Sequence, residues 1–238
     1  NIQLVKDIIT ETADQGKYKS NTEMYQDEIN SYEALLEIHE DMDPEMKLVV
    51  QKRIGELALI QGYLEQEEQF TSSQGGAITL QTDYKSFTKA IKTYETILTK
   101  QQQAKEKNLE DQKLALEIEE TELTLAALYK QTANQEKELQ QYTKLTDRQY
   151  SKETRAKAFQ GLAINAAENE NPNLKEALQL TSDAVSINPE DTSALALQHN
   201  LQQSLLRAKQ AKLQSNAMEI RGKVPEKLGI TNYKGDIW

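Results

Sequence analysis

The stretch Ile29-Asn30-Ser31-Tyr32-Glu33-Ala34-Leu35-Leu36 recurs further along the chain as Ile91-Lys92-Thr93-Tyr94-Glu95-Thr96-Ile97-Leu98. The two stretches align without a gap and lie 62 residues apart. Their apolar residues are three and four positions apart, which is the period of one face of an α-helix. Shorter matches follow at Leu139-x-x-Tyr142 and Leu178-x-x-Thr181. Self-similarity of this kind predicts a helical-repeat protein.

The repeating unit is a pair of helices, because another helical segment precedes each of these stretches. A short pair cannot bury its apolar stripe alone, so neighbouring pairs must stack. Helices are expected at residues 2–19, 21–41, 44–69, 82–101, 105–131, 134–145, 151–168, 174–187 and 192–217. They form pairs at 1–41, 43–101, 105–147 and 151–188, with a terminal helix at 192–217, in one domain over residues 1–221. Beyond Gly222 the helical pattern ends, which predicts an extended tail over residues 222–238.

The fourth pair has small and aromatic residues at spacings that let two helices approach closely. They are Phe159, Leu162, Ala163 and Ala166 in the first helix, and Ala177, Ala184 and Pro189 in the second helix and its exit turn. This pattern resembles the tetratricopeptide-repeat family. The resemblance implies an all-α fold, a right-handed superhelical array of antiparallel helix pairs, here about four pairs plus a terminal helix. The chain departs from the family at Thr181, where an aromatic residue is usual, in the long turn at 169–173, and in its longer early helices.

Composition limits the classes of partner. The formal net charge is −10, with 28 Lys and Arg against 38 Asp and Glu. Nucleic acid and anionic lipid both require clustered basic residues, so neither is an expected partner. The chain has no cysteine, which removes disulfides and thiolate sites, and no apolar run approaches the roughly 20 residues of a membrane span. Because the chain begins at Asn1, removal of an upstream leader, anchor or domain stays an open alternative.

The sequence contains no converging set of catalytic or metal-binding residues. The only histidines are His39, beside an acidic segment before Pro44, and His199 on the final helix. Neither has the spacing of a standard metal site. Gly75-Gly76 lacks the lysine of a phosphate loop. The carboxylates of residues 117–122 point around their helix, which predicts a solvated surface, with contact to a basic partner as the alternative. We therefore expect no enzyme activity, no metal and no cofactor.

Tyrosines are the candidate interaction residues, because a tyrosine buries a large ring and keeps a polar end. Tyr32, Tyr94 and Tyr142 recur on equivalent helices, which predicts a packing role. The candidates for contact with a partner are Tyr25, Tyr63, Tyr84, Tyr129, Tyr233 and Trp238. The last two lie in the apolar tail, which could pack on the last helix, on a neighbouring copy or in a groove. The loop at residues 70–80 is either a tolerated insertion or a partner contact.

The function expected from these features is a non-catalytic scaffold or adaptor. It would bind a peptide or helix of another protein on the concave face of the solenoid. The alternative is a structural role in a homo-oligomer or envelope assembly, through the long helices and the tail. A bacterial periplasm or cell envelope is the favoured location, with the cytoplasm as the alternative; the sequence identifies neither pathway nor partner.

Overall fold

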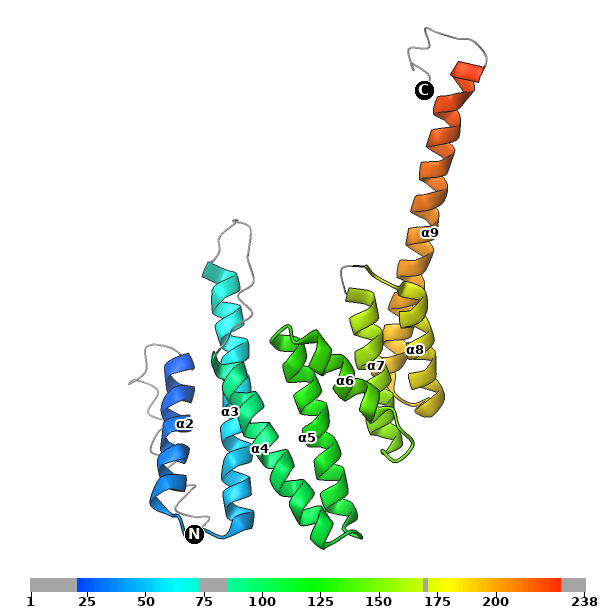
Figure 1. Ribbon diagram of the computed structural model, residues 1–238. Coiled ribbons are helices and arrows are strands. Elements are labelled where there is room, and N and C mark those ends of the chain that lie inside the picture. The colour runs from blue at the N-terminus through cyan, green and yellow to red at the C-terminus, as the bar shows by residue number, and fades with distance from the viewer. Residues whose placement is uncertain (1–20, 73–84, 169–170, 228–238) are drawn as a thin grey trace. The chain divides into compact units, whose positions relative to one another are not determined.

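The computed structural model describes residues 21–72, 85–168 and 171–227, and these residues form eight α-helices and no strand (Figure 1). The helices are α2 (Asn21–Ile38), α3 (Pro44–Ser72), α4 (Lys85–Lys107), α5 (Gln112–Gln131), α6 (Gln135–Leu145), α7 (Lys152–Glu168), α8 (Leu174–Ile187) and α9 (Thr192–Lys227). The predicted all-α class is confirmed for this part of the chain. The helix expected at residues 2–19 lies outside the described residues.

Short polar side chains start several helices. Asp43 accepts a hydrogen bond of 2.8 Å from the Glu45 backbone N–H, and Pro44 takes the first helical position. Asn134 caps α6 and Asn173 caps α8 in the same way, each bonding the N–H three residues on. These starts agree with the turns predicted from the sequence.

Two predicted helix boundaries are wrong. A helix was expected to begin at Lys105, but α4 continues to Lys107 and α5 begins only at Gln112. The break falls where Asp111 caps α5 by accepting the Leu114 N–H at 2.9 Å. The terminal helix was expected to end at residue 217, but α9 continues to Lys227, through part of the expected tail. One glycine costs a helix only about 1 kcal/mol, so Gly222 does not end it.

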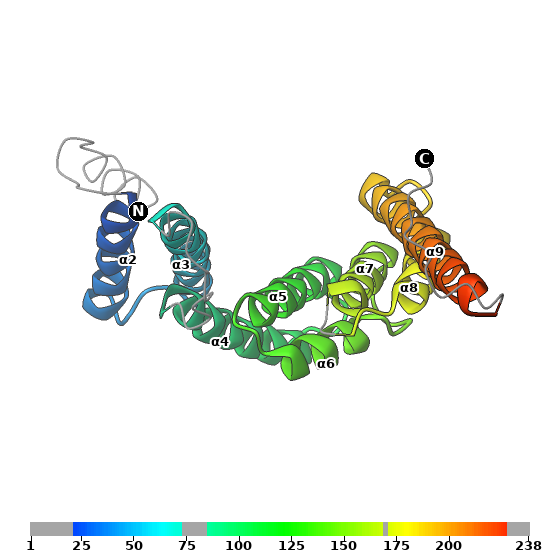
Figure 2. The same cartoon turned by 90° about the horizontal axis from the view of Figure 1, so that it is seen from above.

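The chain divides into two compact units, Asn1–Ala158 and Phe159–Trp238, where the sequence predicts one domain over 1–221. In the first unit each helix packs on the next, from α2 through α6. The directions of α2 and α4 are opposite to those of α3 and α5 (Figure 1). Seen from above, α3 and α5 lie on one side and α4 and α6 on the other, so the unit has two layers (Figure 2).

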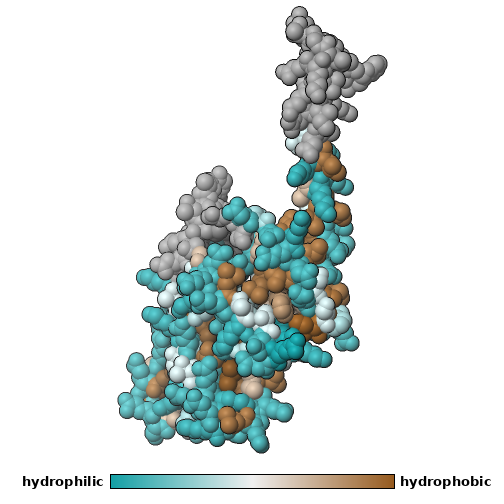
Figure 3. All heavy atoms as spheres, turned by 45° about the vertical axis from the view of Figure 1, so that its right-hand side comes forward, coloured by the Kyte–Doolittle hydropathy of each residue, from teal (hydrophilic) through white to brown (hydrophobic). Residues whose placement is uncertain are grey.

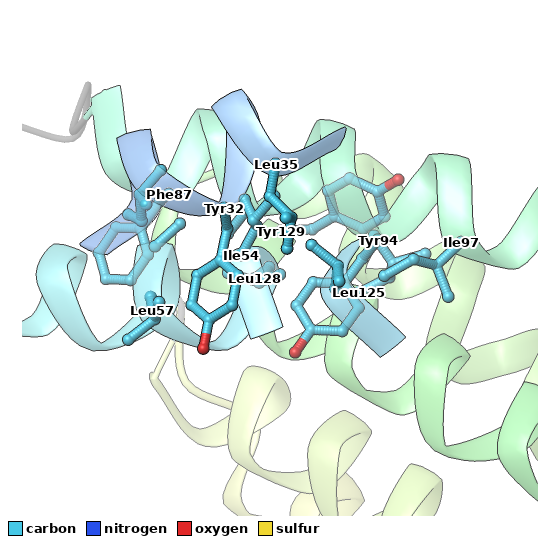
Figure 4. Close-up of a cluster of buried hydrophobic side chains, with 14 residues drawn as sticks. Tyr32, Leu35, Ile54, Leu57, Phe87, Tyr94, Ile97, Leu125, Leu128 and Tyr129 are labelled. Atoms are coloured by element: carbon cyan, nitrogen blue, oxygen red, sulfur yellow. The ribbon is translucent and has the colours of Figure 1, made fainter. Parts of the chain in front are cut away.

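The core of the first unit lies between these layers. Its buried residues come from α2, α3, α4 and α5, including Ile29, Tyr32, Leu57, Phe87, Tyr94, Ile97, Leu125 and Leu128 (Figure 4). Tyr32, Tyr94 and Tyr142 are each less than a tenth exposed. The predicted packing role of the recurring tyrosines is therefore confirmed.

Two glycines allow α3 and α4 to approach closely. A Cβ atom on Gly62 would lie 2.6 Å from the Phe87 ring, and one on Gly55 would lie 3.0 Å from the Tyr94 ring. Seven residues separate the two glycines, and seven separate the two aromatic residues. The same contact thus occurs twice along an antiparallel pair, two helical turns apart.

Ion pairs and amide contacts connect alternate helices. Between α2 and α4, Lys89 Nζ lies 2.8 Å from Glu33 Oε1. Between α4 and α6, Lys137 Nζ lies 3.4 Å from Glu95 Oε1. In the other layer, Lys52 Nζ lies 2.9 Å from Glu117 Oε2, and Gln66 Nε2 donates to Gln131 Oε1 at 3.3 Å. Both α3–α5 contacts join residues 65 positions apart, as expected for two parallel helices in constant register.

The second unit has its own small core. Ala166, Ala177 and Leu201 are buried against each other, and α8 packs on the start of α9. Ala163, Ala177 and Ala184 are fully buried, so the small residues that carried the family resemblance occupy packing positions. Thr181 is also fully buried, and its hydroxyl donates to the Ala177 carbonyl, so its polar atom is satisfied.

Candidate functional site

The candidate site is a groove between the parallel helices α3 and α5. Its larger part has a volume of about 450 Å³ and extends to the turn between α4 and α5. Its walls are residues of α3, the end of α4, the α4–α5 turn and α5, namely Glu45, Leu48, Val49, Lys52, Ala104, Asn108, Asp111, Lys113, Leu114 and Glu117. The groove lies wholly within the first unit.

A smaller hollow of about 80 Å³ continues the groove along the same two helices. Lys52 lines both parts, and Tyr94 of α4 lies in the smaller one with Glu56 and Glu120. Burial, with smaller contributions from the Glu56 and Glu120 carboxylates, raises the pKa of Tyr94 to about 12. The Tyr94 hydroxyl is therefore a neutral donor and acceptor at physiological pH.

Helical spacing brings the wall residues together. Glu45, Val49, Lys52 and Glu56 are three or four residues apart and so share one face of α3. The matching face of α5 carries Lys113, Glu117, Glu120 and Thr124. The Lys52–Glu117 ion pair joins the two walls, and Lys113 Nζ lies 3.8 Å from the other oxygen of Glu117.

Charge and apolar surface alternate in the groove. Five carboxylates line it, Glu45, Glu56, Asp111, Glu117 and Glu120, against the two lysines Lys52 and Lys113. This leaves a formal excess of three negative charges. Between them Leu48, Val49 and Leu114 add apolar surface, and Val49 is 61% exposed. Ile60 and Tyr63 continue the exposed apolar stripe on α3, at 37% and 45%.

Apolar surface, in brown, lies among mostly hydrophilic surface on the face shown in Figure 3. Helix α3 buries Val50, Ile54 and Leu57 in the core. Its exposed apolar side chains contribute little to that core. The groove therefore offers apolar contact area between charged side chains.

The six residues predicted to contact a partner have different positions. Tyr63 lies on the exposed stripe of α3, where its ring meets Phe87 edge-on at 5.3 Å. Tyr25 is half-buried and packs against the core. The predicted partner contact at Tyr129 is corrected, because this residue is only 8% exposed. Its hydroxyl donates to Glu95 at 2.8 Å and its ring is part of the core. Tyr84, Tyr233 and Trp238 lie outside the described residues.

Sequence reasoning missed the groove residues Val49 and Glu56, whereas Glu120 belongs to the 117–122 carboxylates for which contact with a basic partner was the alternative. The available signal was that α3 has more apolar residues than one buried stripe requires, since Val49 and Ile60 stand beside Val50 and Leu59.

Over residues 21–72, 85–168 and 171–227, no group of three or more His, Asp and Glu side chains is arranged to hold a metal ion. His39 and His199 are both exposed. None of the helices in this part of the chain combines the length and apolar character that crossing a membrane requires.

Comparisons with protein-family models, with curated proteins and with solved structures gave no significant match. The α3–α5 groove itself is thus the basis for a functional hypothesis.

Proposed function

We propose that this protein is a non-catalytic interaction scaffold whose α3–α5 groove binds a segment of another protein. The observation that carries the proposal is the exposed apolar wall at Val49, set among carboxylates in a groove between two parallel helices. In a tetratricopeptide-like array, α3 and α5 would be the inner helices of successive pairs, and the groove would belong to the concave face.

The repeated contacts support such an array. Alternate helices are joined by Glu33–Lys89 and Glu95–Lys137 in one layer and by Lys52–Glu117 in the other. Helices that keep a constant register along their length present fixed side chains, which lowers the entropy lost when a ligand binds.

The chemistry of the groove defines the class of partner. Its acidic excess favours lysine and arginine side chains, and its apolar wall favours leucine-like anchors. A basic amphipathic helix offers both on one face. The proposed ligand is therefore a basic, leucine-bearing helical segment.

A synthetic probe tests this proposal. The probe is a fluorescein-labelled helical peptide of leucine and lysine at helical spacing, titrated into the full chain and followed by anisotropy. Glu56→Lys combined with Glu120→Lys should weaken binding about tenfold or more, since two attractive charges become repulsive. Val49→Ser, at an exposed position, should weaken it by removing apolar contact without changing the charge of the groove.

The matched control reverses two exposed carboxylates outside the groove lining, Glu37→Lys with Glu106→Lys. This variant has the same net charge as the groove variant and should bind the probe nearly as well as the wild type. Equal loss in both variants would show a non-specific charge effect and would overturn the groove as the binding site. A scrambled peptide of the same composition controls for the helical arrangement of the probe.

A further inference from the structure

The second half of α9 is a helix without a packing partner among the described residues. Its first turns pack on α8, where Ala194 and Leu201 are buried and Gln198 donates to Ser182 at 3.1 Å. From Gln202 to Ser215 every side chain except the half-buried Leu205 is exposed. Figure 1 shows this part of α9 extending past α8. A helix segment of this length is marginal in water on its own, so a partner would stabilise it.

This segment carries an apolar face. Leu206 is 50% exposed and Leu213 is 67% exposed. They are seven residues apart, which places them on the same side of the helix about 10 Å from each other. Two leucines at heptad spacing are the anchors that a helix uses when it binds in a groove.

The same segment is basic, although the whole chain has a net charge of −10. It contains Arg207, Lys209 and Lys212, and no Asp or Glu occurs anywhere from Thr192 to Met218. Its charge of +3 equals in size and opposes in sign the excess of three carboxylates in the α3–α5 groove. The segment therefore has the composition of the ligand proposed for that groove.

We infer that residues 202–215 of α9 in one copy of the chain bind in the α3–α5 groove of a second copy. This inference rests on the proposed function of the groove, and it names a second copy of the chain as a partner. The contact is heterologous, because a helix of one copy meets a groove of the other. Each bound copy still offers its own free groove and its own free helix, so association continues into larger species or closes into a ring.

A coiled coil between two α9 helices is the competing arrangement. It would bring two segments of charge +3 together, and like charges in contact are repulsive. Charge complementarity favours the groove.

Two variants of the full chain separate these arrangements. The helix variant carries Leu206→Ser and Leu213→Ser, both at exposed positions, and retains an intact groove. The groove variant carries Glu56→Lys and Glu120→Lys and retains an intact α9. Circular dichroism first establishes that both are folded, and sedimentation velocity then measures mass from about 1 to about 100 µM.

The wild type should self-associate with rising concentration and dissociate as salt is added. Each variant alone should be monomeric, and their equimolar mixture should form a dimer and stop there, because only one intact groove and one intact helix remain per pair. The control with Glu37→Lys and Glu106→Lys should associate like the wild type.

Three results would overturn the inference. A groove variant that still self-associates would favour pairing between α9 helices, and a mixture that stays monomeric would remove the groove–helix contact. A wild type that is monomeric throughout would exclude self-association. If the leucine–lysine probe still binds the groove in that case, the proposed function stands and only the second copy is lost as a ligand.

Discussion

Glu33 of α2 pairs with Lys89 of α4 at 2.8 Å, and the same relationship recurs one step further along the chain. Glu95 of α4 pairs with Lys137 of α6 at 3.4 Å. Each glutamate directly follows a buried tyrosine, Tyr32 or Tyr94, and each lysine precedes the buried tyrosine of its own helix by five residues. The repeat in the sequence therefore includes the ion pairs between successive helix pairs as well as the core residues.

Replacing Gly62 with alanine should lower the free energy of unfolding by up to about 2 kcal/mol. Alanine favours a helix by about 1 kcal/mol, but its Cβ would lie 2.6 Å from the fully buried Phe87 ring, and overpacking of this kind costs about 1–3 kcal/mol. Urea unfolding measures the change. Gly55→Ala, with a contact of 3.0 Å, should cost less, and Phe87→Leu should restore part of the loss in the Gly62→Ala background. A stabilised Gly62→Ala protein would contradict the close approach of α3 and α4.

The repeat and the helical periodicity predict the core well, because both depend on local spacing. The α4–α5 boundary was missed because the turn at Asn108–Asp111 contains neither glycine nor proline. The Asp111 cap was the available signal, but apolar residues on both sides conceal it. A cap is worth only about 1 kcal/mol and is a weak signal beside a continuous helical pattern.

The groove was less predictable than the core, because it depends on which face of α3 meets α5. Val49 and Val50 are neighbours in the sequence, yet Val49 is 61% exposed and Val50 is 2% exposed. Only the packing of α4 and α5 distinguishes them. Tyrosines were predicted as partner contacts because this residue type is common at interfaces. Tyr129 instead lies in the core, where its hydroxyl donates a hydrogen bond to Glu95.

Ala133→Gly should raise the free energy of unfolding by about 0.5–1 kcal/mol. Ala133 has a φ of 52°, the left-handed region, where an L-residue with a Cβ is disfavoured by about 1–2 kcal/mol and glycine is not. It occupies the position after the C-cap of α5, where the Asn134 N–H bonds to Tyr129 O and the Ala133 N–H to Lys130 O. Thermal or urea unfolding measures the gain. Ala34→Gly, at an exposed position within α2, should have the opposite sign, and a loss at both positions would contradict the turn geometry.

Stability should fall between pH 10 and about 12, partly because of Tyr94. Its pKa is about 12 in the folded chain, raised first by burial and then by Glu56 and Glu120, against about 10 in the unfolded chain. The unfolded chain therefore loses this proton at lower pH than the folded chain does. The contribution of Tyr94 to the free energy of unfolding is complete below pH 10 and decreases as pH rises towards 12. Burial and Glu138 raise the pKa of Tyr142 to about 12 as well, so its contribution has the same sign.

Urea unfolding between about pH 9 and pH 11 measures how steeply the free energy of unfolding falls with pH, in Tyr94→Phe and in the wild type. The slope should be smaller in the variant because one of the shifted tyrosines is gone. Glu56→Gln with Glu120→Gln should reduce the slope by less, since burial remains the main cause. An unchanged slope in Tyr94→Phe would mean that its hydroxyl is open to solvent.

Lys144→Met should be destabilising by about 1–3 kcal/mol, because it leaves a buried carboxylate without its cation. Glu122 is 1% exposed, and its Oε1 lies 2.6 Å from Lys144 Nζ. Breaking a fully buried pair costs about 3–5 kcal/mol, and the smaller value applies here because the Lys144 side chain is 47% exposed and partly screened by water. The second carboxylate oxygen of Glu122, Oε2, is buried without a hydrogen-bond partner among the described residues, so Lys144 is the main compensation for its charge. Adding Glu122→Gln to Lys144→Met should recover much of the loss, since no uncompensated charge remains in the core.

Urea unfolding of the single and double variants provides the comparison, with Lys157→Met as an exposed lysine control. If Lys144→Met cost no more than Lys157→Met, the buried Glu122 carboxylate would not depend on this lysine.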